Sequence, residues 1–161
     1  MVNKKLTLMF FGTSKHVVDG ICPAIADRIA NRFKGITVYK LDKRGIKWAS
    51  DYIQNAPQDE QIILIDIALL NTTKPYKYCK DGIYPAKGLD KNQNIKLNAE
   101  AFLININGVY PGVYSTQLKN FKKNMNTKEV RTKALERAVE GFEFISNVIL
   151  AWRSQNTMDI K

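Results

Sequence analysis

Near-continuous apolar runs alternate with amphipathic stretches over the first 70 residues of the chain. The apolar runs cover roughly residues 5–11 and 61–67, and their lack of polar alternation predicts buried strands of a parallel sheet. Residues 36–41 include β-branched side chains and predict a further strand. Between them, residues 19–33 and 45–55 place apolar side chains at three- and four-residue spacing, which predicts two helices. This β-α-β-α-β order predicts a parallel sheet with helices packed on its faces.

The rest of the chain departs from this alternation. Residues 70–98 are rich in Asn, Lys, Gly, Tyr and Pro, and the pieces 77–79 and 82–85 resemble short edge strands. Residues 101–107 predict a further strand, and an apolar stripe across 128–153 predicts a long final helix. A length of 161 residues is ordinary for one domain, so we expect a single α/β domain over the whole chain.

Composition indicates a soluble globular protein, with 45% apolar and 25% charged residues. No apolar run approaches the roughly 18 residues that cross a bilayer, so we expect no membrane partner. The N-terminus has no cleavage site of the signal-peptide type. Cys22 and Cys79 have no metal-ligand spacing and are expected to be reduced thiols. Together these features predict a cytoplasmic protein.

The net charge of +10 raises the question of nucleic-acid binding. The lysines are spread along the chain without a block of five or more, and many stand beside asparagine. A scattered surplus of lysine is typical of proteins encoded by A/T-rich genomes. We therefore do not expect nucleic acid to be the partner.

Two aspartates stand where parallel sheets carry their ligands. Asp19 follows the first predicted strand across a short loop, and Asp66 ends the aliphatic run 62–65. Ligands bind in the crevice outside the carboxyl ends of such strands. If the strands are neighbours, the carboxylates share that crevice and can perform acid/base chemistry or bind a cation. Asp19 could instead cap the following helix, whereas Asp66 faces a desolvation cost unless it has partners.

The segments around these aspartates resemble two families of proteases. Gly12-Thr13 followed by Asp19-Gly20-Ile21-Cys22-Pro23 is similar to the first motif of the hydrogenase maturation endopeptidases and the spore germination proteases. Ile65-Asp66-Ile67-Ala68 resembles their second motif, except that Ile67 replaces a small residue. Segments 82–91 and 103–108 look similar to those of the YyaC-like sporulation proteins, which are relatives of the germination protease.

The resemblance implies a three-layer α/β/α sandwich with a mostly parallel mixed sheet. It also implies a peptidase-like activity on a protein or peptide substrate, with Asp19 and Asp66 as the catalytic pair. In the maturation endopeptidases the matching acids and a downstream histidine bind a metal. This chain has no histidine after Asp66, and substitution by Glu100 or Asn98 is conjecture. We therefore expect no metal and no cofactor.

The alternative is a non-catalytic peptide- or partner-binding module on the same fold, which the missing histidine and Ile67 motivate. Besides the aspartate pair, His16, Asn107 and Glu100 are the candidate substrate-binding residues. His16 lies in the first loop beside Lys15, and a loop histidine is equally compatible with simple solvation. The oligomeric state is left open.

Overall fold

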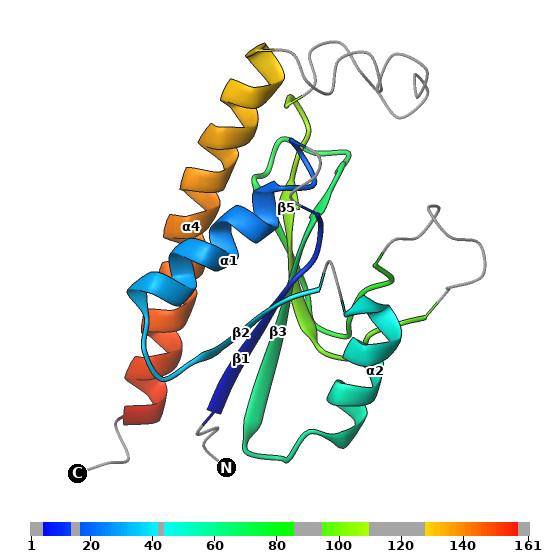
Figure 1. The fold of residues 1–161 in the computed structure, drawn as a ribbon, viewed down its shortest axis with the longest axis vertical. Coiled ribbons are helices and arrows are strands. Elements are labelled where there is room, and N and C mark those ends of the chain that lie inside the picture. The colour runs from blue at the N-terminus through cyan, green and yellow to red at the C-terminus, as the bar shows by residue number, and fades with distance from the viewer. Residues whose placement is uncertain (1–4, 14–16, 42–43, 86–94, 110–127, 158–161) are drawn as a thin grey trace.

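A computed structural model shows a five-stranded sheet with helices on both of its faces (Figure 1). It describes residues 5–13, 17–41, 44–85, 95–109 and 128–157. The helices and strands are, in chain order, β1 (Lys5–Phe10), α1 (Ile21–Arg32), β2 (Thr37–Lys40), α2 (Gly45–Asn55), β3 (Glu60–Ala68), β4 (Tyr76–Cys79), β5 (Glu100–Asn105) and α4 (Lys128–Thr157).

The strand order is β2-β1-β3-β5-β4. The first four of these strands run parallel, and β4 pairs with β5 in the antiparallel direction. β1 and β3 lie side by side, with Met9 opposite Leu64 and Phe10 opposite Ile65. The predicted α/β/α sandwich with a mostly parallel mixed sheet is confirmed, and the strands that precede Asp19 and contain Asp66 are neighbours.

Side chains of the central strands alternate between two cores, one on each face of the sheet. One core joins β1, β3 and β5 to α1 and α4, and Leu8, Phe10 and Ile65 are among its fully buried members from β1 and β3. The other core lies under α2 and includes Met9 and Leu64. Because both faces are covered, these strands have the near-continuous apolar sequences noted above.

The structure differs from the sequence-based expectations at several element ends. α1 begins at Ile21 with Gly20 as its N-cap, so Asp19 lies one position before the N-cap of this helix. Residues 82–85 were expected as an edge strand, but only Ile83 forms an isolated bridge, to Leu97. β5 ends at Asn105 rather than 107, and the backbone N–H of Val109 donates to the carbonyl of Ile106 in the turn that follows.

No helix in the described part of the chain is long and apolar enough to span a lipid bilayer.

Candidate functional site

A cavity of about 300 Å³ lies at the carboxyl ends of β1, β2 and β3. Asp19 and Asp66 both line it. The remaining lining residues come from the loop after β1, the residue after β2, the start of α2, β3 and the segment after β4: Phe11, Gly12, Thr13, Leu41, Gly45, Ile46, Ile67 and Pro85. The lining is therefore mostly apolar, with two carboxylates as its charged groups.

The chain reaches Asp19 through a tight approach of two backbone segments. Gly12 follows β1 with a φ of +114°, a conformation that favours glycine. A β-carbon at Gly12 would lie 2.2 Å from the carbonyl oxygen of Asp19. The backbone N–H of Ile21 then donates to the carbonyl of Val18 and closes the turn into α1. The absence of a side chain at Gly12 thus allows the Asp19 segment to pack against the end of β1.

Asp66 stands within β3, between the fully buried Ile65 and the partly buried Ile67. The backbone N–H of Ile67 donates to Asp66 Oδ1 at 2.8 Å. Burial, with a smaller contribution from the charge of Asp19, raises the pKa of Asp66 to about 7, although the bond from Ile67 acts to lower it. A substantial fraction of Asp66 therefore carries a proton near neutral pH.

Desolvation is the largest cause of the raised pKa of Asp66, and the charge of Asp19 is a smaller one. Asp66 is therefore an acid that can hold a proton near neutral pH.

Cys22 lies directly behind this pair, in the first turn of α1. Its side chain is fully buried, and burial raises the pKa of the thiol, with Asp66 and Asp19 adding to the effect. A buried thiol with a raised pKa is a poor nucleophile. Cys22 is instead a small residue of the core, in the same cluster as Val18 and Ile25.

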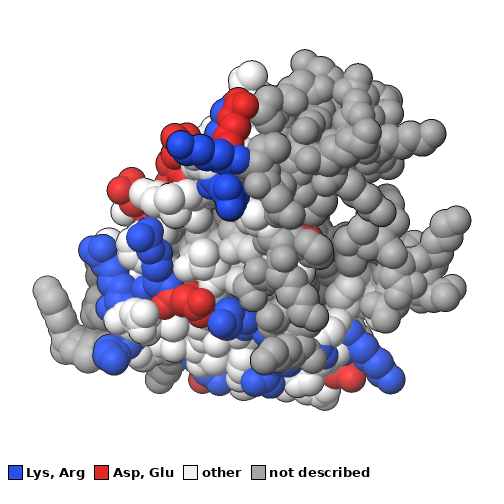
Figure 2. Space-filling view, turned by 45° about the horizontal axis from the view of Figure 1, so that its top comes forward, with Lys and Arg blue, Asp and Glu red and all other residues white. Residues whose placement is uncertain are grey.

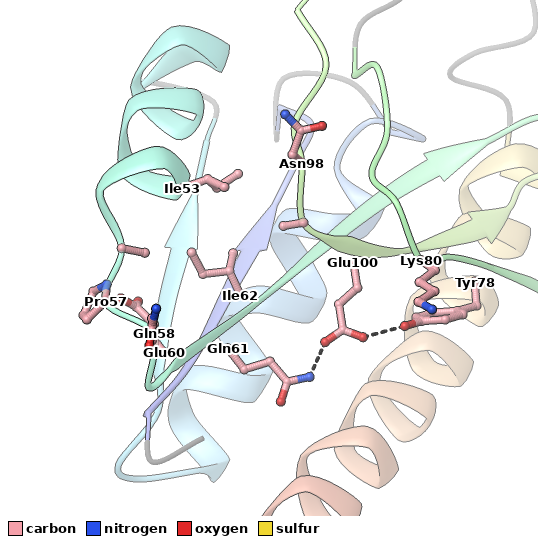
Figure 3. Close-up of a pocket in the computed structure, with 12 residues that line it drawn as sticks. Ile53, Pro57, Gln58, Glu60, Gln61, Ile62, Tyr78, Lys80, Asn98 and Glu100 are labelled. Carbon is pink, nitrogen blue, oxygen red and sulfur yellow. Dashed lines mark hydrogen bonds between the residues drawn. The ribbon is translucent and has the colours of Figure 1, made fainter. Parts of the chain in front are cut away.

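Glu100 is not brought together with the aspartates. It begins β5, at the opposite end of the parallel strands, and lines a separate hollow of about 460 Å³ (Figure 3). Its carboxylate accepts hydrogen bonds from the Gln61 side chain and from the Tyr78 hydroxyl, the latter at 2.7 Å. The bond from Tyr78 raises the pKa of that phenol, and the two bonds together link β3, β4 and β5. This position is too far along the sheet for Glu100 to contact a ligand in the aspartate cavity.

Asn107 follows β5 at the same end of the sheet as the aspartates, but it does not line their cavity. Its amide donates to the carbonyls of Leu70 and Thr72, and so it holds the loop that follows β3. Asn105, which the sequence did not single out, has the larger role in this loop. Its buried amide donates to Thr72 and Lys74, and its oxygen accepts the N–H groups of Leu70 and Asn107.

Replacement of Asn105 by alanine is expected to lower the free energy of unfolding by roughly 3 kcal/mol, because four buried hydrogen bonds are lost together. Asn107→Ala removes two more exposed bonds and should cost about 1 kcal/mol. Urea unfolding of both variants measures this difference. Equal losses in the two variants would contradict the assigned role of Asn105.

His16 and a candidate metal site are the remaining features that the sequence raised for this cavity. His16 lies outside the described residues, so its relation to the cavity stays a prediction. Within the described ranges, no group of three or more His, Cys, Asp or Glu side chains is arranged to hold a metal ion. The apolar wall of Leu41, Ile46 and Pro85 could not be inferred as part of the site, because these residues come together only through the β2–α2 connection and the segment after β4.

Basic and acidic side chains are interspersed over the described part of the face in Figure 2. This agrees with the scattered lysines of the sequence. Ion pairs within the described surface include Lys40 with Asp27 at 2.8 Å, between β2 and α1.

Comparisons with known proteins give a structural likeness. No family model matches the chain, and no curated protein matches it. Among solved structures, the chain is similar to the hydrogenase 2 maturation peptidase from Thaumarchaeota archaeon SCGC_AB-539-E09. The identity is 13% and the TM-score 0.43, over 89% of this chain and 99% of that one. A likeness at this level does not establish activity, and membership of the YyaC-like family stays a prediction.

Proposed function

We propose that the cavity at the carboxyl ends of β1 and β3 is the active site of a peptidase-like hydrolase with Asp19 and Asp66 as its acid/base pair. The observation that carries this proposal is that both carboxylates line one cavity while burial raises the pKa of Asp66 to about 7. Groups with perturbed pKa values in a cavity are candidates for catalysis. The finer assignment, to proteases of the sporulation and germination type, is part of the proposal and rests on the motif resemblance.

The raised pKa of Asp66 suggests the division of labour. The Asp19 carboxylate, on the loop before α1, takes a proton from a water molecule as that water attacks the peptide carbonyl. Asp66 then donates its proton to the amide nitrogen, the C–N bond breaks, and an acid and an amine leave. Acid/base catalysis of this kind contributes about 10²–10⁴ in rate, so either carboxylate alone should leave little activity.

The pH dependence follows from the protonation state of Asp66. Its general-acid role requires the proton, which is lost as the pH rises through about 7. The rate of cleavage should therefore fall above this pH. If Asp66 had only a structural role, the rate should show no such fall at alkaline pH.

The test is cleavage of a proteome-derived peptide library, with new termini identified by mass spectrometry. Asp19→Asn and Asp66→Asn should each lower the rate at least about 100-fold. Asp51→Asn is the matched control, since Asp51 is an exposed residue of α2 that does not line the cavity. Its rate should equal that of the wild type.

Two results would overturn the proposal. Cleavage that persists in both cavity variants would remove the catalytic role of the pair. An absence of cleavage by the wild-type protein would remove the hydrolase assignment and leave the partner-binding alternative.

A further inference from the structure

The strand β2 forms an outer edge of the sheet (Figure 1). Leu41, which directly follows this strand, lines the aspartate cavity. Among the described residues, β1 is the strand with which β2 pairs. The β2 residues Thr37, Val38 and Tyr39 are partly buried, as expected for a strand with one neighbour. An edge of this kind presents backbone groups that can pair with another chain.

The hydrogen-bond pattern identifies which backbone groups face outward. The N–H of Leu41 donates to the carbonyl of Phe10, so Leu41 faces β1. Because the hydrogen-bonding direction alternates along a strand, Tyr39 also faces β1 and Val38 faces away from it. The N–H and C=O of Val38 therefore point to the outer side of the sheet, where an added strand would bind them.

The same strand leads directly into the cavity. β2 ends at Lys40, and Leu41, Gly45 and Ile46 of the next segment all line the space that holds the two aspartates. The carboxyl end of β2 therefore lies next to the cavity.

A cationic group lies beside β2, over the ring of one of its residues. The guanidinium of Arg44 lies over the rings of Tyr39 and Trp48, at 5.1 and 4.8 Å from their centroids. Tyr39 and Trp48 are themselves packed edge to face at 5.0 Å, and Tyr52 completes the aromatic cluster. Stacking on these rings orients the plane of the Arg44 guanidinium. Because Arg44 is exposed, the edge of the guanidinium can bind a carboxylate.

We propose that an extended peptide pairs with the outer edge of β2 as an added strand, with an acidic side chain bound by Arg44, and that this pairing delivers the peptide to the aspartate cavity. The proposal deepens the hydrolase assignment and rests on it for the fate of the peptide. Main-chain pairing supplies affinity for the peptide. The aromatic cluster with Arg44 supplies the preference for particular peptide sequences.

The experiment measures binding apart from cleavage. The Asp66→Asn protein is immobilised and exposed to a proteome-derived peptide library, and captured peptides are identified by mass spectrometry. Captured peptides should be enriched in Asp and Glu. Val38→Pro should weaken capture about tenfold, because it removes the outward N–H while β1 keeps its own bonds.

Three further measurements test the edge pairing even if Val38→Pro folds poorly. A captured peptide is synthesised with N-methyl groups at single positions, and methylation should weaken binding only at alternate residues. Arg44→Gln should abolish the acidic preference, and Arg44→Lys should restore it in part. Hydrogen exchange at the Val38 amide should slow when the peptide binds.

The outcomes separate the two proposals. Peptides cleaved by the wild type with no effect of Val38→Pro, N-methylation or Arg44→Gln would overturn the edge pairing and leave the hydrolase intact. Capture with the expected pattern but no cleavage would support the edge pairing and overturn the hydrolase. No capture, or capture of nucleic acid from the same sample in place of peptides, would overturn the edge pairing.

Discussion

Gly12→Ala is expected to lower the free energy of unfolding by roughly 4 kcal/mol, among the largest losses for a single loop substitution. The added β-carbon would lie 2.2 Å from the carbonyl oxygen of Asp19 and 3.4 Å from the Pro23 ring. The first of these is a backbone atom, so no side-chain rotation relieves the contact. The φ of +114° adds strain for any residue with a side chain.

Gly35→Ala is the matched control for this prediction. Gly35 also has a positive φ, +79°, but a β-carbon there would meet no atom within 4 Å. Its substitution therefore costs only the backbone strain, about 1 kcal/mol. The difference between the two variants isolates the close approach of Gly12 to Asp19.

Thermal unfolding provides the measurement. For a domain of this size about 1 kcal/mol corresponds to about 2–4 °C, so Gly12→Ala should melt roughly 10 °C below the wild type. Gly35→Ala should melt only a few degrees below it. Equal shifts in the two variants would show that the Asp19 segment does not depend on the space at Gly12.

The part of the fold near Gly12 illustrates what the sequence allowed us to predict. Three predicted strands separated by two amphipathic helices indicated a parallel β-α-β-α-β unit. The structure arranges these strands in the order β2-β1-β3, and this order brings residues 19 and 66 to one end of the sheet. Periodicity is a property of long segments, so the long elements were predicted with small errors at their ends. The prediction of a shared crevice followed from topology and not from any single motif.

Residues whose roles depend on distant contacts could not be assigned in this way. Glu100 and Asn107 were grouped with the aspartates because of their place in the chain. Their side chains instead bind neighbouring strands and the loop after β3. Asn105 forms the buried hydrogen-bond network. The pattern Ile-Asn-Ile-Asn does not indicate which of its two asparagines faces inward. Side-chain partners far apart in sequence decide such roles.

Wild-type stability is expected to fall as the pH rises from about 4 to about 7, relative to the Asp66→Asn variant. In the unfolded chain Asp66 titrates near 3.8, whereas burial in the folded chain raises its pKa to about 7. Between these values the folded protein holds a proton that the unfolded chain has lost, so the stabilising contribution is full below 3.8 and is lost toward 7.

The size of the effect follows from the separation of the two values. A difference of about 3 pH units corresponds to roughly 4 kcal/mol at pH 8, of which relaxation and water entry will remove a part. The asparagine side chain of the variant cannot ionise, and its oxygen can still accept the Ile67 N–H. Asp66→Asn should therefore match the wild type near pH 4 and exceed its stability progressively toward pH 8.

Urea unfolding from pH 4 to pH 8 measures this divergence of the two curves, with Asp51→Asn as the control that should stay parallel to the wild type. Asp19→Asn should move the wild-type transition to slightly lower pH, because the charge of Asp19 is a smaller contributor to the raised pKa than burial is. Parallel curves for Asp66→Asn and the wild type would mean that the Asp66 carboxylate is well solvated in the folded protein. The general-acid role would then lose its physical basis, since an aspartate of ordinary pKa holds almost no proton at neutral pH.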